Sequence, residues 1–157
     1  MTVMGYDVME VLFICSGNTC RSPMAQTLAR DWLKRRGVGA QVTAFSAGIS
    51  AYTGEEATDG AKNAMRTRGL SLDTHRARML TQEIFDGADL VLTMTQGHKQ
   101  AILQVQPNDK TYTLSEYAGV GGYVDDPFGM SDAVYELCAQ QLEQLVDKAM
   151  EWVCAAL

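Results

Sequence analysis

The sequence predicts an α/β fold with three layers, in which a four-stranded parallel sheet carries helices on both faces. Short apolar runs typical of buried strands alternate along the chain with longer segments of helical periodicity. Such alternation predicts parallel strands joined by right-handed helical crossovers. The 157 residues are enough for one domain with its own core. We therefore expect a single domain over residues 1–157, with residues 1–9 as a short N-terminal extension.

The first strand and helix are the clearest elements. Val11–Cys15 (VLFIC) is a continuous apolar run, which is typical of a strand buried on both faces. Ser22 is expected to cap the following helix, with Pro23 at the first helical position. That helix should run to about Arg36, where Gly37 can serve as its C-cap.

The middle of the chain continues the alternation with strands and helices in turn. The predicted elements are a strand at Gln41–Ala47, a helix at Glu56–Arg68 ending at Gly69, a buried strand at Asp89–Met94, a helix at Thr95–Gln106 closed by Pro107, and a short strand at Thr111–Leu114. Ligands of such sheets bind at the carboxyl ends of the strands.

The last predicted element is a long helix over Ser131–Leu157. Its apolar residues recur at spacings of three and four, which is the pattern of a helix with one buried face. They are Val134, Cys138, Leu142, Leu145, Ala149 and Trp152.

Charge and hydropathy exclude several classes of partner. Thirteen Lys and Arg stand against nineteen Asp and Glu, for a net charge of −6. A field of that sign attracts neither nucleic acid nor anionic lipid, so any anion must be bound locally. No apolar run approaches the roughly 18 residues of a membrane span, and residues 1–9 lack the basic start of a secretory signal. We expect a cytoplasmic monomer with no membrane partner.

The cysteines and histidines predict neither a disulfide framework nor a metal site. Cys138 and Cys154 lie about 24 Å apart along one predicted helix, too far to form a disulfide. The CxxxxC spacing of Cys15 and Cys20 matches neither a zinc ribbon nor a CxxC redox motif. The chain has two histidines, too few for a His-rich metal centre. We expect no cofactor.

The segment between the first strand and the first helix has the composition of a phosphate-binding loop. Free N–H groups at a helix N-terminus bind anions, and a planar Arg side chain can hold two phosphate oxygens. Glycine and asparagine allow such a loop to turn tightly. The expected phosphate-binding residues follow Cys15 directly: Ser16, Gly17, Asn18, Thr19, Cys20, Arg21 and Ser22.

Cys15 is the predicted nucleophile of this loop. The helix dipole should lower the pKa of its thiol below the usual value of about 8.5, so that a thiolate can attack phosphorus. Ser22 is placed to donate a hydrogen bond to the sulfur. The alternative is a reduced structural cysteine in a tight turn, but the buried strand before the loop and the capped helix after it favour the catalytic interpretation.

A later loop, Val124–Gly129 (VDDPFG), offers carboxylates for acid–base chemistry. Asp126 precedes Pro127, which restrains its backbone, and is the predicted general acid, with Asp125 as a neighbour that tunes it. The alternative is an ordinary Asp-Pro turn. Phe128 and Tyr52 are loop aromatics that can wall a cleft.

Four motifs together resemble the low-molecular-weight protein tyrosine phosphatases. They are CSGNTCRSPMA, the SAG of Ser46–Gly48, the HRAR of His75–Arg78 and the DDPFG of Asp125–Gly129, in the family's order. The resemblance covers nearly the whole chain and implies the family's four-stranded parallel sheet. It also implies that Cys15 is the nucleophile, Arg21 binds phosphate, Ser22 stabilises the leaving thiolate and Asp126 is the general acid.

The resemblance implies supporting roles as well. It suggests that His75 and Ser46 hydrogen-bond Asn18 and so hold the loop in a strained form. It also suggests that Cys20 can form a reversible disulfide with Cys15, which protects the nucleophile from over-oxidation. It assigns no role to His98.

Two departures from the tyrosine-specific members concern the substrate. Thr19 stands where most of them carry a bulky aliphatic residue, and Phe128 stands where they often carry Tyr. Thr19 resembles the branch that hydrolyses phosphoarginine in proteins, as does the ADLVLTM…HKQ segment. We therefore expect a phosphorylated protein substrate, with phosphoarginine favoured over phosphotyrosine and strict tyrosine specificity as the alternative.

Two further alternatives are less favoured. An arsenate reductase of this fold needs relay cysteines, and residues 69–94 contain none. A non-catalytic phosphate-binding module would be expected to have lost at least one of Cys15, Arg21 and Asp126.

Overall fold

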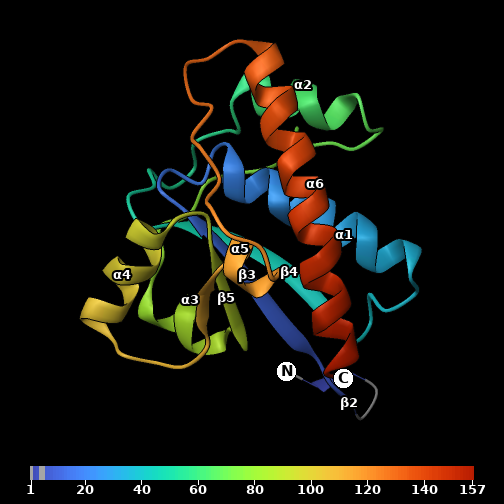
Figure 1. The fold of residues 1–157 in the computed structure, drawn as a ribbon, viewed down its shortest axis with the longest axis vertical. Coiled ribbons are helices and arrows are strands. Elements are labelled where there is room, and N and C mark those ends of the chain that lie inside the picture. Colours follow the sequence, from blue (N-terminus) through green and yellow to red (C-terminus); the bar gives the residue numbers. More distant parts are fainter. Residues whose placement is uncertain (1, 4–5) are drawn as a thin grey trace.

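A computed structural model describes residues 2–3 and 6–157 and contains the predicted parallel sheet. Its strands are β3 (Met9–Cys15), β4 (Val42–Gly48), β5 (Leu90–Thr93) and β6 (Thr111–Thr113). All neighbours are parallel, in the order β4-β3-β5-β6 (Figure 1). The fold class is therefore confirmed, with β3 in the interior of the sheet.

Helices cover both faces of this sheet. One face carries α1 (Arg21–Arg35), α2 (Asp59–Arg66), the short α5 (Leu114–Tyr117) and the long α6 (Asp132–Ala155). The other face carries α3 (Gln82–Gly87) and α4 (Gln96–Val105). Figure 1 shows α6 crossing in front of α1, with α3 and α4 on the opposite side of the sheet.

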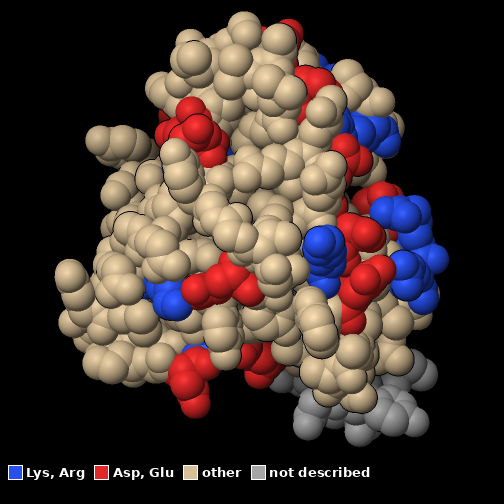
Figure 2. Space-filling model, viewed as in Figure 1, with Lys and Arg blue, Asp and Glu red and all other residues tan. Residues whose placement is uncertain are grey.

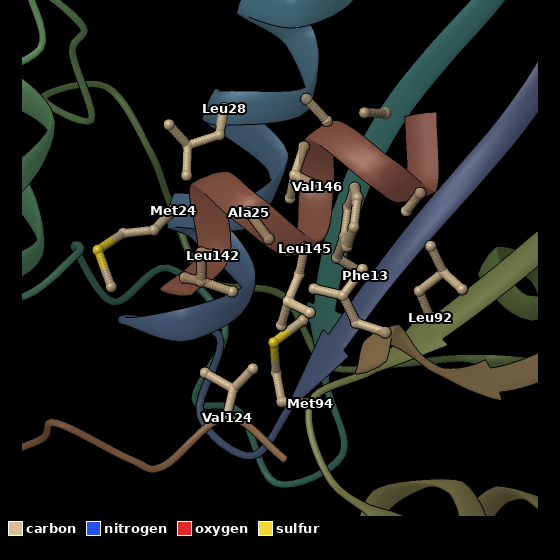
Figure 3. Close-up of a cluster of buried hydrophobic side chains, with 14 of the residues drawn as sticks. Phe13, Met24, Ala25, Leu28, Leu92, Met94, Val124, Leu142, Leu145 and Val146 are labelled. Atoms are coloured by element: carbon tan, nitrogen blue, oxygen red, sulfur yellow. The ribbon is translucent and has the colours of Figure 1, made fainter. Parts of the chain in front are cut away.

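Alternate residues of β3 enter two separate cores. Val11 and Phe13 belong to the cluster under α1 and α6, whereas Leu12 and Ile14 belong to the cluster under α3 and α4. Figure 3 shows Phe13 among the α6 side chains of the larger cluster. A strand whose side chains are buried on both faces has no polar alternation, which explains the continuous apolar run.

The start of α1 differs from the prediction. Cys20, and not Ser22, occupies the N-cap position, and its side chain makes no capping hydrogen bond. The helix therefore begins at Arg21, and Pro23 is its third residue. The Ser22 hydroxyl is free for the loop because the helix does not use it as a cap.

Several other boundaries also move. The second helix begins at Asp59, three residues later than predicted, because Thr58 caps it and Glu56 pairs with Arg76 in an isolated bridge. The last strand ends at Thr113, which caps the unpredicted α5. Within the expected extension, β1 (Thr2–Val3) pairs antiparallel with β2 (Tyr6–Asp7).

The buried face of α6 agrees with the predicted stripe only in its middle. Cys138, Leu142, Leu145 and Ala149 are buried as expected. Trp152 is 61% exposed, and buried Val153 continues the face at a spacing of four from Ala149. Among the described residues, no helix is both long and apolar enough to cross a membrane.

Candidate active site

The loop from Cys15 to Arg21 joins the carboxyl end of β3 to the N-terminus of α1. Cys15 is the last residue of β3 and is 2% exposed, and its sulfur lies 2.9 Å from the Ser22 hydroxyl oxygen. Asn18 Nδ2 donates to that same hydroxyl oxygen at 2.9 Å. Because Ser22 already accepts from Asn18, its own proton can be donated to the Cys15 sulfur.

Asn18 is the strained residue of this loop. Its φ of 57° lies in the left-handed region, whereas Gly17 does not have a positive φ. Of the two residues expected to let the loop turn tightly, Asn18 and not Gly17 therefore adopts the left-handed conformation. Asn18 is held by its side chain, which accepts from the Arg78 backbone N–H at 3.0 Å, and by its carbonyl, which lies 2.8 Å from His75 Nε2. These contacts offset the strain of the left-handed backbone.

The two expected supports of Asn18 have different outcomes. The His75 contact is present, but Ser46 donates to Gln26 at 2.7 Å and does not contact Asn18. The Arg78 backbone makes the side-chain contact expected of Ser46, because the Arg78 segment runs beside the end of β4.

Gly48 has a steric role that the sequence did not reveal. A Cβ at this position would lie 2.4 Å from the Ser16 carbonyl oxygen and 3.0 Å from the Asn18 nitrogen. The loop can therefore approach β4 only because residue 48 lacks a side chain. Backbone bonds from Ile49 to Cys15 and from Ser50 to Ser16 close this contact.

His98 is a buried site residue that sequence reasoning missed. Its Nε2 lies 2.9 Å from the Ser16 hydroxyl, and its Nδ1 lies 3.1 Å from the Thr95 hydroxyl. Burial and the charge of Arg21 lower the pKa of His98 to about 4, while Asp126 opposes them. The imidazole is therefore neutral at pH 7 and ties the start of α4 to the loop. No sequence signal distinguishes it from a surface histidine.

The ionisation of Cys15 also differs from the prediction. Burial raises the pKa of the Cys15 thiol above its ordinary value, and this effect exceeds the opposing hydrogen bonds from Ser22 and the charge of Arg21. The expected lowering is therefore wrong in direction. The loss of water around the sulfur disfavours the thiolate, and the sequence pattern does not reveal how complete that loss is.

Arg21 joins the loop to the predicted acid segment. Its guanidinium is almost fully buried, donates to the Val124 carbonyl at 3.0 Å and lies 3.6 Å from Asp126 Oδ2. The Val124 N–H in turn donates to the Met94 carbonyl beyond β5. Asp126 accepts from the Phe128 N–H at 3.1 Å and remains half-exposed. The structure thus places the Asp126 carboxylate beside the loop, more than 100 residues away in sequence.

A cleft of about 240 Å³ collects most of the predicted site residues. It is lined by Cys15, Gly17, Thr19, Cys20, Arg21, Ser50, Tyr52, Glu55, Asp126 and Phe128. Thr19, Tyr52 and Phe128, predicted to govern specificity, are therefore together. Ser16, Asn18 and Ser22 are not among the lining residues. Ser50 and Glu55 are additional lining residues that the sequence did not single out.

Cys20 is buried within the same region. Its sulfur lies 3.3 Å from the Tyr135 hydroxyl and 3.4 Å from the Thr58 hydroxyl. Cys15 and Cys20 are both free thiols in this structure.

Comparisons with known proteins show the family of this chain. The sequence profile described as "Low molecular weight phosphotyrosine protein phosphatase" matches residues 10–156. A protein-arginine-phosphatase from Bacillus subtilis is 41% identical over 141 residues, covering 88% of this chain and 92% of the relative. The low molecular weight protein-tyrosine-phosphatase PtpB from Staphylococcus epidermidis is 36% identical over 141 residues, covering 89% and 96%.

A solved structure shares the whole architecture. The low molecular weight protein tyrosine phosphatase from T. tengcongensis superimposes with a TM-score of 0.87 at 40% sequence identity. The match covers 91% of this chain and 98% of that one.

Proposed function

This chain belongs to the low molecular weight phosphotyrosine protein phosphatase family. From that premise we propose that it hydrolyses phosphorylated side chains through a cysteinyl-phosphate intermediate. We propose further that it prefers phosphoarginine. The substrates are phosphorylated proteins. We further propose that the enzyme acts as a cytoplasmic monomer. The observation that carries the proposal is the single cleft that contains Cys15, Arg21 and Asp126.

The first step transfers the phosphoryl group to Cys15. The loop N–H groups and Arg21 hold the phosphoryl oxygens at the N-terminus of α1. Cys15 first gives its thiol proton to a phosphoryl oxygen of the dianionic substrate. The thiolate then attacks phosphorus and forms an S–P bond as the bond from phosphorus to the substrate nitrogen or oxygen breaks. Asp126 donates its proton to the departing atom, so that tyrosine leaves as a neutral phenol and arginine leaves as its guanidinium cation.

The second step releases inorganic phosphate. Asp126, now a carboxylate, takes a proton from water as the water oxygen attacks phosphorus. The S–P bond breaks and Cys15 departs as a thiolate. Ser22 stabilises that thiolate through the 2.9 Å contact with the sulfur. Asp126 thereby regains the proton that it gave to the leaving group, and the second hydrogen of the water stays on the released phosphate. Cys15 recovers its thiol proton as the phosphate leaves.

Thr19 supports phosphoarginine as the substrate. It lines the same cleft as Cys15 and is 6% exposed, so its side chain is little hydrated. A hydroxyl there can accept a hydrogen bond from a guanidinium N–H, which a phenol ester does not offer. The 41% identity to a relative named protein-arginine-phosphatase supports the same choice.

The second candidate is a tyrosine-specific phosphatase. Tyr52 and Phe128 line the same cleft and are 81% and 63% exposed. Aromatic walls of this kind can stack on a phenol ring. The Staphylococcus relative, at 36% identity, is named a tyrosine phosphatase.

A comparison of two matched peptides decides between these candidates. We expect the parent enzyme to hydrolyse the phosphoarginine peptide with a kcat/KM at least about 10-fold above that for the phosphotyrosine peptide of the same flanking sequence. Thr19→Ile should remove or invert this preference. Thr19→Val, which keeps the shape and loses the hydroxyl, should follow Thr19→Ile, whereas Thr19→Ser should resemble the parent.

Cys15→Ser is the control for the covalent step. It should abolish turnover of both peptides while retaining binding of inorganic phosphate. A parent enzyme that prefers phosphotyrosine, or a preference that survives Thr19→Ile, would contradict the assignment of phosphoarginine.

A further inference from the structure

A tight turn beside the cleft presents a carboxylate that the proposed chemistry does not use. The Glu55 N–H donates to the Tyr52 carbonyl at 3.2 Å, and Gly54 between them has a φ of 97°. Tyr52 and Glu55 are therefore the first and fourth residues of one β-turn, which keeps their Cα atoms within about 7 Å of each other. Two backbone bonds to Ala77, at 2.8 and 2.7 Å, fix the turn to the neighbouring segment.

Glu55 differs from its neighbour Glu56 in its partners. The Glu56 carboxylate lies 3.1 Å from Lys62 and 3.8 Å from Arg76, and these cations lower its pKa. The Glu55 carboxylate makes neither an ion pair nor a side-chain hydrogen bond with any residue in the described ranges 2–3 and 6–157. One carboxylate of the adjacent pair is thus neutralised on the surface, and the other lines the cleft.

The cleft places opposite charges at different positions. Arg21 is buried in the loop that holds the phosphoryl oxygens. Glu55 is exposed and lines the cleft together with the exposed rings of Tyr52 and Phe128. A carboxylate that shares a cleft with two aromatic rings suits a flat cation, because the carboxylate can form paired hydrogen bonds with a guanidinium while the ring faces attract the guanidinium's charge.

The two candidate substrates differ in the group that follows phosphorus. In phosphoarginine it is a planar, cationic guanidinium, whereas in phosphotyrosine it is an uncharged ring. An unpaired carboxylate attracts the guanidinium and has no comparable attraction to the uncharged ring. It repels the phosphoryl charge of both substrates equally. Its net effect is therefore selection for the guanidinium.

We propose that Glu55 is a specificity-determining residue whose carboxylate binds the guanidinium of phosphoarginine in the cleft. This inference rests on the proposed phosphatase function and names how that site selects its substrate. It assigns Glu55 a role in substrate binding. The chemical steps are still carried out by Cys15 and Asp126.

The kinetic test compares Glu55→Gln with Glu56→Gln on the two matched peptides. We expect Glu55→Gln to raise the KM for phosphoarginine about 5- to 20-fold with kcat within about twofold, and to leave the phosphotyrosine KM unchanged or lower, as expected for loss of one ion pair at a binding site. Glu56→Gln should change neither. Glu55→Asp should restore part of the phosphoarginine affinity, and high salt should narrow the difference between parent and Glu55→Gln.

A binding measurement separates this inference from the proposed function. Free phosphoarginine is titrated calorimetrically into Cys15→Ser and into Cys15→Ser with Glu55→Gln. A loss of affinity that depends on Glu55 supports the inference even if the parent fails to turn phosphoarginine over, an outcome that would refute the proposed function alone. Equal affinities, or an equal loss on both peptides in the kinetic test, would refute the role of Glu55.

Discussion

Burial and hydrogen bonding act on the Cys15 sulfur in opposite directions. Burial raises the pKa of its thiol, while the Ser22 hydroxyl and backbone, the Arg21 charge and the Asn18 backbone lower it. Ser22 can act in this way because it is the second residue of α1 and its hydroxyl is not used as a cap. The proposed thiolate therefore depends on a small set of contacts that offset the loss of water.

Replacement of Ser22 by Ala should make the nucleophile harder to ionise. The hydroxyl that donates to the sulfur is removed, so we expect the thiol pKa to rise by about 1 unit and alkylation by iodoacetamide at pH 7 to slow about 10-fold. Mass spectrometry of the Cys15 peptide across a pH series measures this shift. Cys154 on α6 is the internal reference and should react as before. An unchanged Cys15 profile would show that Ser22 does not stabilise the thiolate.

Asp126→Asn should affect substrates according to their leaving groups. A poor leaving group needs the proton that Asp126 supplies, whereas an activated aryl phosphate does not, so we expect a loss of about 10²-fold or more on the former and a much smaller loss on the latter. Steady-state kinetics over a series of aryl phosphates gives the slope of log kcat against the pKa of the leaving group. Asp132→Asn, at the exposed start of α6 and outside the cleft, is the control and should keep the parent's slope. Equal losses across the series would remove Asp126 from the acid role.

The edge strand β4 is closed by side chains from two other segments. Register with β3 leaves the Ala44 and Ser46 carbonyls on the free edge. Arg30 of α1 donates to Ala44 at 2.8 Å and Arg78 donates to Ser46 at 2.8 Å, and both guanidiniums lie over the Phe45 ring. These arginines occupy acceptors that would otherwise pair with a strand of another chain.

Arg30→Met should expose one of these carbonyls. Met keeps the apolar stem and removes the donor, so we expect the free energy of unfolding to fall by about 1 kcal/mol and self-association to increase. Urea unfolding and light scattering measure the two effects. Arg35→Met, which removes an exposed Arg bonded to Asp31 on the same helix, should change stability by less than about 0.5 kcal/mol. Equal effects of the two variants would show that the edge contact does not matter.

The sequence predicted those elements whose signal is local and long enough. The apolar run of β3 and the loop after it are contiguous, and each residue type there has a physical use. The helices α3 and α5, with six and four residues, are too short for periodicity, and only their caps, Thr81 and Thr113, offered a signal. At the ends of elements, propensity yields to contacts such as the bridge between Glu56 and Arg76.

The parts of the candidate site that the sequence missed depend on tertiary contacts. His98 belongs to the site because α4 brings its ring to Ser16. Gly48 is needed because the phosphate-binding loop passes so close to β4 that a Cβ at residue 48 would clash with it. Glu55 and Glu56 are indistinguishable in the sequence, and only the fold gives one a pair of cations and the other a place in the cleft. The predicted direction of the Cys15 pKa shift was wrong for the same reason, because burial is a property of the folded chain.

The protein carries a net charge of −6, yet charges of both signs are interspersed on the face seen in Figure 2. Figure 2 shows Lys and Arg lying beside Asp and Glu along the face that contains α6. Arg68 contacts Glu136 and Glu143 at 2.6 and 2.8 Å, and Arg36 lies 3.7 Å from Glu151. Paired surface charges contribute little to stability individually. Any strong dependence of folding on pH should therefore come from buried groups.

His98 should make the protein lose stability on mild acidification. Its folded pKa of about 4 lies below the unfolded value of 6.5, because burial and Arg21 disfavour the charged imidazole. A lowered histidine pKa means that the unfolded chain binds the proton first, so stability falls as pH drops below about 6.5 and levels off near 4. Glu136, whose pKa is lowered to about 2 by its contact with Arg68, acts in a separate window below 4.5.

We therefore expect the free energy of unfolding to fall by about 2 kcal/mol between pH 7 and 4.5 on account of His98. Urea unfolding at several pH values measures this loss in the parent. His98→Asn should be less stable at pH 7, because the contact with Ser16 is lost, yet its stability should change less over the same interval. If that variant fails to fold, an NMR titration of the His98 ring in the parent still shows whether the folded-state pKa of His98 is lowered. A ring that titrates near 6.5 would show that burial does not hold the imidazole neutral and that the acid sensitivity has another source.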